Sequence, residues 1–188
     1  FLIPSTRLAG GHVDAPWRIE MLGWLRATRG DHVVSRFRSQ KIRSLFAYLA
    51  YHLDRPHPRE TLIELLWPEC DPAAGRQRLR QALHLLRHQL EPPGVPAGAV
   101  IRADHAAVQL NSAACTTDVA EFEAALQWAP RADSDTEQAQ RLSEAVALYR
   151  GELLPGCFED WVLSERQRLS EGYLQALDQL ASLLQQPG

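Results

Sequence analysis

The stretch from Pro72 to Leu90 combines strong helix boundaries with a narrow apolar stripe. Asp71 suits the N-cap of a helix and Pro72 its first turn, and the run Pro92-Pro93-Gly94 would end it. At about 100° per residue, one arc of this helix carries Leu79, Leu83, Leu86 and Leu90, with Ala82 beside them. The sequence therefore predicts an amphipathic helix that docks on a core through its leucines, and the neighbouring elements must fit around it.

The opposite face of this predicted helix is polar, and no acidic residue occurs between positions 72 and 90. The outward side chains are Gln77, Arg80, Gln81, His84 and His88, and Arg76, Arg78 and Arg87 lie on the flanks. Surface helices usually mix acids with bases, which favours solubility and i, i+4 ion pairs. In the major groove arginine binds guanine and glutamine binds adenine, and flanking arginines reach phosphates. These residues are therefore candidate DNA contacts, with an ordinary amphipathic surface helix as the structural alternative.

The elements around this helix are predicted in the order sheet, helix, helix, helix, hairpin. Strands are expected over 17–21, 24–27 and 32–34, helices over 39–53 and 59–67, and a hairpin over 100–110. Ser39 suits the N-cap of the first helix. This order is typical of a winged helix-turn-helix, in which the second and third helices and the hairpin face DNA.

Other basic residues are weaker candidates. Arg102 lies on the hairpin, where it would touch a phosphate or the minor groove, but Asp104 at the turn opposes this, and a purely structural role is an equal alternative. A basic cluster precedes and enters the first helix, and it suits either the DNA backbone or a solvated face. Its members are Arg36, Arg38, Lys41 and Arg43.

Charge divides the chain into two parts. Residues 1–113 hold 15 Lys and Arg against 10 Asp and Glu, whereas residues 114–188 hold 5 Arg against 13 Asp and Glu. All seven histidines fall in the first part. Such asymmetry indicates two modules with different partners. We expect a tail or linker over 1–16, a DNA-binding domain over 17–113 and a helical domain over 114–188.

The second part reads as helical throughout. Asp118 with Glu121 resembles a capping box, and Ser134 with Glu137 has the same form. A helix ending at Tyr149 would be capped by Gly151. A last helix is expected over 160–184, with an apolar side of Leu163, Leu169, Tyr173, Leu177, Leu180 and Leu184.

Several functional classes lack support in the sequence. The motifs G-x-S-x-G, H-E-x-x-H and G-x-x-x-x-G-K-[ST] are all missing, so neither catalytic residues nor a cofactor site are expected. The three cysteines lie more than 40 positions apart and form no metal or redox spacing. Their odd, sparse count fits a reducing cytoplasm. No apolar run approaches the ~20 residues of a membrane span.

The chain also resembles a known family. The stretches "MLG" at 21–23, "SQKIRSLFAYLAYHLDRPHPRETLIELLWPE" and "RQRLRQALHLLRHQL" are similar to those of SARP-type activators, bacterial regulators that join an OmpR-type winged helix to a bacterial transcriptional activation domain. The run Leu66-Trp67-Pro68 carries the most specific part, followed by the pairs Leu79-Arg80 and Leu86-Arg87. Downstream, Tyr149-Arg150-Gly151 and Trp161 with Glu165-Arg166 match the start of the activation domain.

The resemblance implies a mainly α fold with a small antiparallel β component: a winged helix-turn-helix followed by an all-α, tetratricopeptide-like domain that is truncated here. It implies binding to double-stranded promoter DNA, cooperating dimers on direct repeats and recruitment of RNA polymerase. An alternative is a protein–protein interaction module, because winged helices and helical hairpins also bind proteins. That reading predicts exposed apolar residues on the 72–90 helix, and only Leu85 fits.

Overall fold

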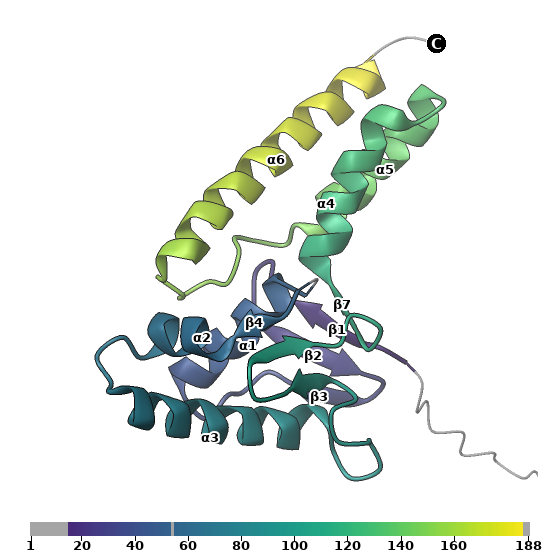
Figure 1. Cartoon of the computed structure of the whole chain (residues 1–188). Coiled ribbons are helices and arrows are strands. Elements are labelled where there is room, and N and C mark those ends of the chain that lie inside the picture. The colour runs from purple at the N-terminus through teal and green to yellow at the C-terminus, as the bar shows by residue number, and fades with distance from the viewer. Residues whose placement is uncertain (1–14, 54, 186–188) are drawn as a thin grey trace, which may run out of the picture.

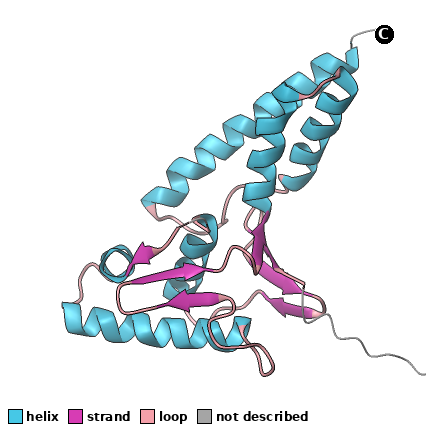
Figure 2. Ribbon diagram, turned by 45° about the vertical axis from the view of Figure 1, so that its right-hand side comes forward, coloured by secondary structure: helices cyan, strands magenta, loops and turns pink. Residues whose placement is uncertain are grey.

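The computed structural model describes residues 15–53 and 55–185. Two small sheets and three helices form a compact lower part, and three further helices rise from it (Figure 1). The long helix at the base of the molecule lies on the side opposite the rising helices in both views (Figure 2). The expected tail over 1–16 falls almost entirely outside the described residues.

The N-terminal sheet contains the three predicted antiparallel strands and one that the sequence did not suggest. β1 (Trp17–Glu20) pairs with β2 (Arg26–Arg29), which pairs with β3 (His32–Val34). β2 begins two residues later than predicted. The extra strand, β7 (Cys115–Thr117), pairs with β1 in parallel, so the sheet order is β3-β2-β1-β7. Because parallel partners come from distant parts of the chain, no local signal marks such a strand.

Three helices follow, and the first and third of them begin at the predicted N-caps. α1 (Gln40–Tyr51) begins after Ser39, whose hydroxyl accepts a hydrogen bond from the amide of Ile42 at 3.3 Å. α2 (Arg59–Leu66) and α3 (Pro72–Leu90) are joined by a short turn. The carboxylate of Asp71 accepts from the amides of Ala73 and Ala74, as expected of an N-cap. The leucine stripe of α3 and Ala82 are buried as predicted.

The predicted hairpin consists of β5 (Ile101–Ala103) and β6 (Ala107–Leu110). A short strand, β4 (His57–Pro58), adds to its outer edge and was not predicted. Asp104 closes the turn, because its carboxylate accepts from the amides of Ala106 and Ala107 at 2.7 and 2.8 Å. These elements complete a winged helix-turn-helix.

The rising part consists of α4 (Asp118–Trp128), a short 3₁₀ helix η1 (Ala129–Arg131), α5 (Asp135–Leu148) and α6 (Asp160–Gln185). One buried cluster continues from the winged part into these helices, through Phe122, Ala145 and Leu169. The predicted fold, a winged helix followed by an all-α domain, is therefore confirmed. No helix among the described residues is long and apolar enough to cross a membrane.

Three local predictions in this part were wrong. Thr117, not Asp118, caps α4, because its hydroxyl accepts from the amide of Ala120 while Asp118 accepts from the amide of Met21, just after β1. Gly151 does not cap α5 but packs on Gly23, since an added Cβ would lie 3.0 Å from the Gly23 Cα. Leu163 and Leu184 of α6 are exposed rather than buried. The first two errors arise because a distant segment, which the local pattern does not show, decides the contact.

Candidate nucleic-acid interface

Helix α3 is held in place by long-range hydrogen bonds in addition to the packing of its buried leucines. The indole of Trp17 donates to the carbonyl of Leu90 at 3.1 Å, which satisfies one of the free carbonyls at the end of the helix. The amide of Gln89 donates to the carbonyl of Arg36 at 2.9 Å. The C-terminal end of α3 is therefore anchored to both β1 and the segment before α1, and its outer face has a defined direction.

The outer face of α3 presents the residues singled out from the sequence. The exposed candidates are Arg76, Gln77, Arg78, Arg80, Gln81, His84 and His88. Arg80 Nη1 donates to Gln77 Oε1 at 3.0 Å. This bond occupies the acceptor of the Gln77 side chain and leaves its amino group free to donate outward. Their contact with DNA stays a prediction, but all of them are accessible to a ligand.

Arg87 differs from the other α3 candidates because it is half-buried against the wing. Its Nη2 donates to the carbonyl of Ile101 at 3.2 Å. Its Nε is buried without a hydrogen-bond partner and lies 4.0 Å from Glu91 Oε2, too far for a hydrogen bond. The Glu91 carboxylate instead accepts from three backbone amides, those of Gly98, Val100 and Ile101. Arg87 and Glu91 together therefore hold the start of the wing against α3.

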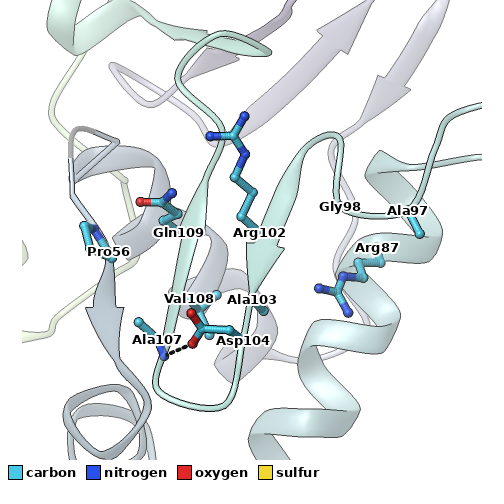
Figure 3. Close-up of a pocket in the computed structure, with 10 residues that line it drawn as sticks. All are labelled: Pro56, Arg87, Ala97, Gly98, Arg102, Ala103, Asp104, Ala107, Val108 and Gln109. Carbon is cyan, nitrogen blue, oxygen red and sulfur yellow. Dashed lines mark hydrogen bonds between the residues drawn. The ribbon is translucent and has the colours of Figure 1, made fainter.

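A cleft separates α3 from the wing (Figure 3). Arg87 lines it from the helix, and Arg102 lines it from β5. Arg102 is exposed and pairs across the hairpin with Gln109. The pKa of Asp104, at the turn, is lowered because its carboxylate accepts from the amides of Ala107 and Ala106. Asp104 is thus ionised and committed to the turn, while Arg102 is free to reach outward.

A second groove runs along the other flank of α3, between this helix and the start of α1. It is lined by Arg38, Ser39, Lys41, Ile42, Trp67, Arg78, Gln81, Ala82 and Leu85. No acidic residue lines it, and its cations come from two separate elements. From the sequence, Arg38 and Lys41 suited either the DNA backbone or a solvated face. In the folded structure both line this groove together with Arg78. Arg43 departs from this cluster, because its Nη2 donates to the carbonyl of Pro155 at 3.0 Å.

The helical part is joined to the winged part by polar contacts. The amide of Leu154 donates to the carbonyl of Met21 at 2.9 Å, and within the helical part Arg166 Nη2 donates to the carbonyls of Leu154 and Cys157, both at 3.0 Å. Tyr51 donates its hydroxyl to Glu165 Oε2 at 2.5 Å, and Arg168 bonds to Tyr51 at 3.0 Å. Burial would raise the pKa of Glu165, but the bonds from Tyr51 and Arg168 hold it below the ordinary value. These contacts orient the rising helices relative to α3.

The described residues do not bring together a metal site. No group of three or more His, Cys, Asp or Glu side chains that could hold a metal ion occurs in 15–53 and 55–185. Cys115 and Cys157 are buried, and burial raises the pKa of the Cys115 thiol to about 12. A thiol with this pKa is protonated at neutral pH and is a poor nucleophile.

Comparison with known proteins identifies the architecture. Residues 117–188 match the family model of the bacterial transcriptional activator domain. A solved structure of Mycobacterium tuberculosis EmbR in complex with a low-affinity phosphopeptide is similar, with a TM-score of 0.74 and 25% sequence identity over 89% of this chain. The resemblance to SARP-type activators is confirmed. This chain spans 45% of the length of the EmbR chain. No curated protein matches it.

SARP-type proteins regulate transcription and are not a class of enzymes. The order of the two parts agrees with the order expected of SARP-type activators. The winged helix precedes the matched activator domain, which starts at Thr117 in β7.

Proposed function

We propose that the chain binds double-stranded DNA in a sequence-specific manner through the outer face of α3. The observation that carries this proposal is an exposed helix face without acids, flanked on both sides by cations. Arg78 lies beside Arg38 and Lys41 on one flank, and Arg102 stands on the wing beyond the other. The major groove is bounded by two phosphate backbones, so a helix that enters it meets a backbone on each side.

Within the groove, the side chains of α3 would divide between base reading and backbone contact. Gln77, Gln81 and Arg80, which are exposed, would meet base edges, since glutamine pairs with adenine and arginine with guanine. Arg76, Arg78 and Arg102 would contact phosphates or, for Arg102, the minor groove. Arg87 would contribute mainly by fixing the wing, because its guanidinium already bonds to Ile101.

The regulatory role that we propose is activation of transcription in the cytoplasm. SARP-type regulators bind promoter DNA, and we infer that this chain recruits RNA polymerase and binds direct repeats as cooperating dimers. We also propose the division into a DNA-binding domain over 17–113 and a helical domain over 114–188. β7 lies beyond position 113 and pairs with β1, so the two domains would share one sheet.

A second candidate function is protein binding. The groove beside α3 has an apolar floor of Ile42, Trp67 and Leu85 under a cationic rim, which would also suit an acidic helix of a partner. EmbR, the similar protein, was solved with a phosphopeptide, so a protein ligand is a reasonable alternative for this architecture.

The deciding experiment is selection of bound duplexes from a random pool, followed by sequencing and a salt titration. Sequence-specific binding predicts enrichment of one short motif, and log affinity should fall by ~0.9 per phosphate contact against log salt. Arg141→Ala serves as a matched control, because Arg141 is an exposed arginine on α5 that pairs with Glu144. It should bind like the unmodified chain. Failure to bind any duplex at low salt would favour the protein-binding alternative.

A further inference from the structure

The centre of the α3 outer face carries no permanent charge. At about 100° per residue, Gln77, Gln81, His84 and His88 fall within an arc of about 60° opposite the buried leucines. The arginines of this helix lie to either side of that arc. Positive charge at the centre of the face can therefore come only from the two histidines.

Arginines and apolar side chains are the main neighbours of these histidines. Arg80 and Arg87 lie one turn before and one turn after His84 on the same helix. From outside the helix, a shallow hollow beside both histidines is lined by Pro92, Pro93, Val95 and Ala97. These side chains are apolar and bring no carboxylate.

Glu91 is the acidic residue that lines the same hollow. Its side chain is only 4% exposed, and its carboxylate accepts from the amides of Gly98, Val100 and Ile101. The charge of Glu91 is thus directed toward the backbone of the wing and toward Arg87. The helix itself contributes no acid, and its C-terminal dipole acts on His88 alone.

We propose that His84 and His88 bind DNA as imidazolium ions, so that DNA binding takes up protons. This inference rests on the proposed function. A duplex would surround the two rings with phosphates, whose negative field favours a cation. Histidine titrates near neutral pH, so this change of field acts in the physiological range. An imidazolium offers two N–H donors, which match the N7 and O6 acceptors of guanine or a phosphate oxygen.

Proton uptake has a measurable consequence. By linkage, the affinity must rise as the pH falls, with a limiting slope of tenfold per pH unit for each proton bound. With two histidines on this face, we expect affinity for the selected duplex to fall roughly tenfold between pH 6.0 and pH 7.5. A helix that used only arginine and glutamine would bind equally well across this range.

The test measures affinity of the whole chain for the selected duplex from pH 6.0 to pH 8.0 at constant ionic strength. The double variant His84→Gln/His88→Gln keeps hydrogen-bonding side chains but cannot gain a proton. Its affinity should change less than about twofold over the same range. The matched control is Gln77→Ala, which removes a central contact without a titratable group. It should bind more weakly at every pH but keep the slope of the unmodified chain.

Two results would overturn the inference: a flat pH profile of the unmodified chain, or an unchanged slope in the double histidine variant. Both differ from failure of the proposed function, which would show as no duplex binding at any pH. Circular dichroism at each pH, on the chain without DNA, checks that the fold is constant over the range.

Discussion

The carboxylate of Asp118, at the start of α4, accepts hydrogen bonds from the backbone amide of Met21, which lies 2.9 Å from both carboxylate oxygens. A further bond reaches the amide of Leu22 at 2.9 Å. Asp118 is 4% exposed, so this contact joins the winged part to the helical part inside the core. Its burial has a cost, because a buried carboxylate loses hydration.

We expect the stability of the protein to depend on pH through Asp118. Burial, with a smaller contribution from nearby Glu20, raises the pKa of Asp118 to about 6 against the opposing effect of the amide hydrogen bonds. The folded state then binds a proton more tightly than the unfolded state. The resulting stabilisation is full below about pH 4 and is lost as the pH rises through 6. Between pH 5 and pH 7 the loss should be about 1 kcal/mol.

Urea denaturation of the unmodified chain and Asp118→Asn at both pH values measures this effect. Other carboxylates, such as Glu165 with its lowered pKa, make the protein more stable as the pH rises. They do so equally in both proteins, so the difference between the two isolates Asp118. The unmodified chain should lose about 1 kcal/mol more than the variant on going from pH 5 to pH 7. An equal change in the two proteins would show that Asp118 does not titrate in this range.

Gly75 allows α2 and α3 to approach closely. A Cβ at this position would lie 2.4 Å from Ile63 Cγ2 on α2. Gly75→Ala should therefore lower the free energy of unfolding by about 1–3 kcal/mol, although alanine is the better helix former. In an Ile63→Ala background, which removes the clashing atom, the same change should be neutral or stabilising. A similar loss in both backgrounds would place the strain elsewhere.

Arg80→Ala tests base reading. Removing a guanidinium that meets a base edge should weaken specific binding by about 1–3 kcal/mol and relax the preference at one position of the selected motif. Binding competition against single-base variants of the motif measures both effects. Equal losses on every sequence would instead assign Arg80 to a phosphate.

Trp67→Ala tests the link between α2 and α3. Trp67 is 9% exposed and belongs to the main core, so its truncation should cost about 3–5 kcal/mol and unfold much of the winged part. Trp128→Ala is the matched control, because that indole is 58% exposed, and it should stay within about 1 kcal/mol of the unmodified chain. Thermal unfolding of the two variants side by side compares their stabilities. Full stability of Trp67→Ala would show that the Trp67 side chain does not stabilise the core.

Elements with local signals were predictable from the sequence. Ser39 and Asp71 mark helix starts because their side chains bond to amides two or three residues ahead. The direction of α3 was also predictable, since the spacing of its leucines defines the buried arc and hence the exposed candidates. The absence of acidic residues from this face follows directly from the sequence, and folding only determines that the face is exposed.

The partners of distant segments were not predictable in this way. The sequence could not tell that Arg87 would bond to the wing while Arg80 stayed exposed, because both occupy polar positions of one helix. Nor could it tell that Arg38 would join Arg78 while Arg43 turned to Pro155.

The sequence by itself determined the helices, the N-caps Ser39 and Asp71, and the charge of the face that meets the proposed ligand, because these depend on spacing along one segment. Only the tertiary structure decided that β7 extends the first sheet and that Asp118 bonds to Met21 instead of capping its own helix. Parallel pairing and buried carboxylate bonds join residues about a hundred positions apart, and their free energy arises only when both segments leave water together.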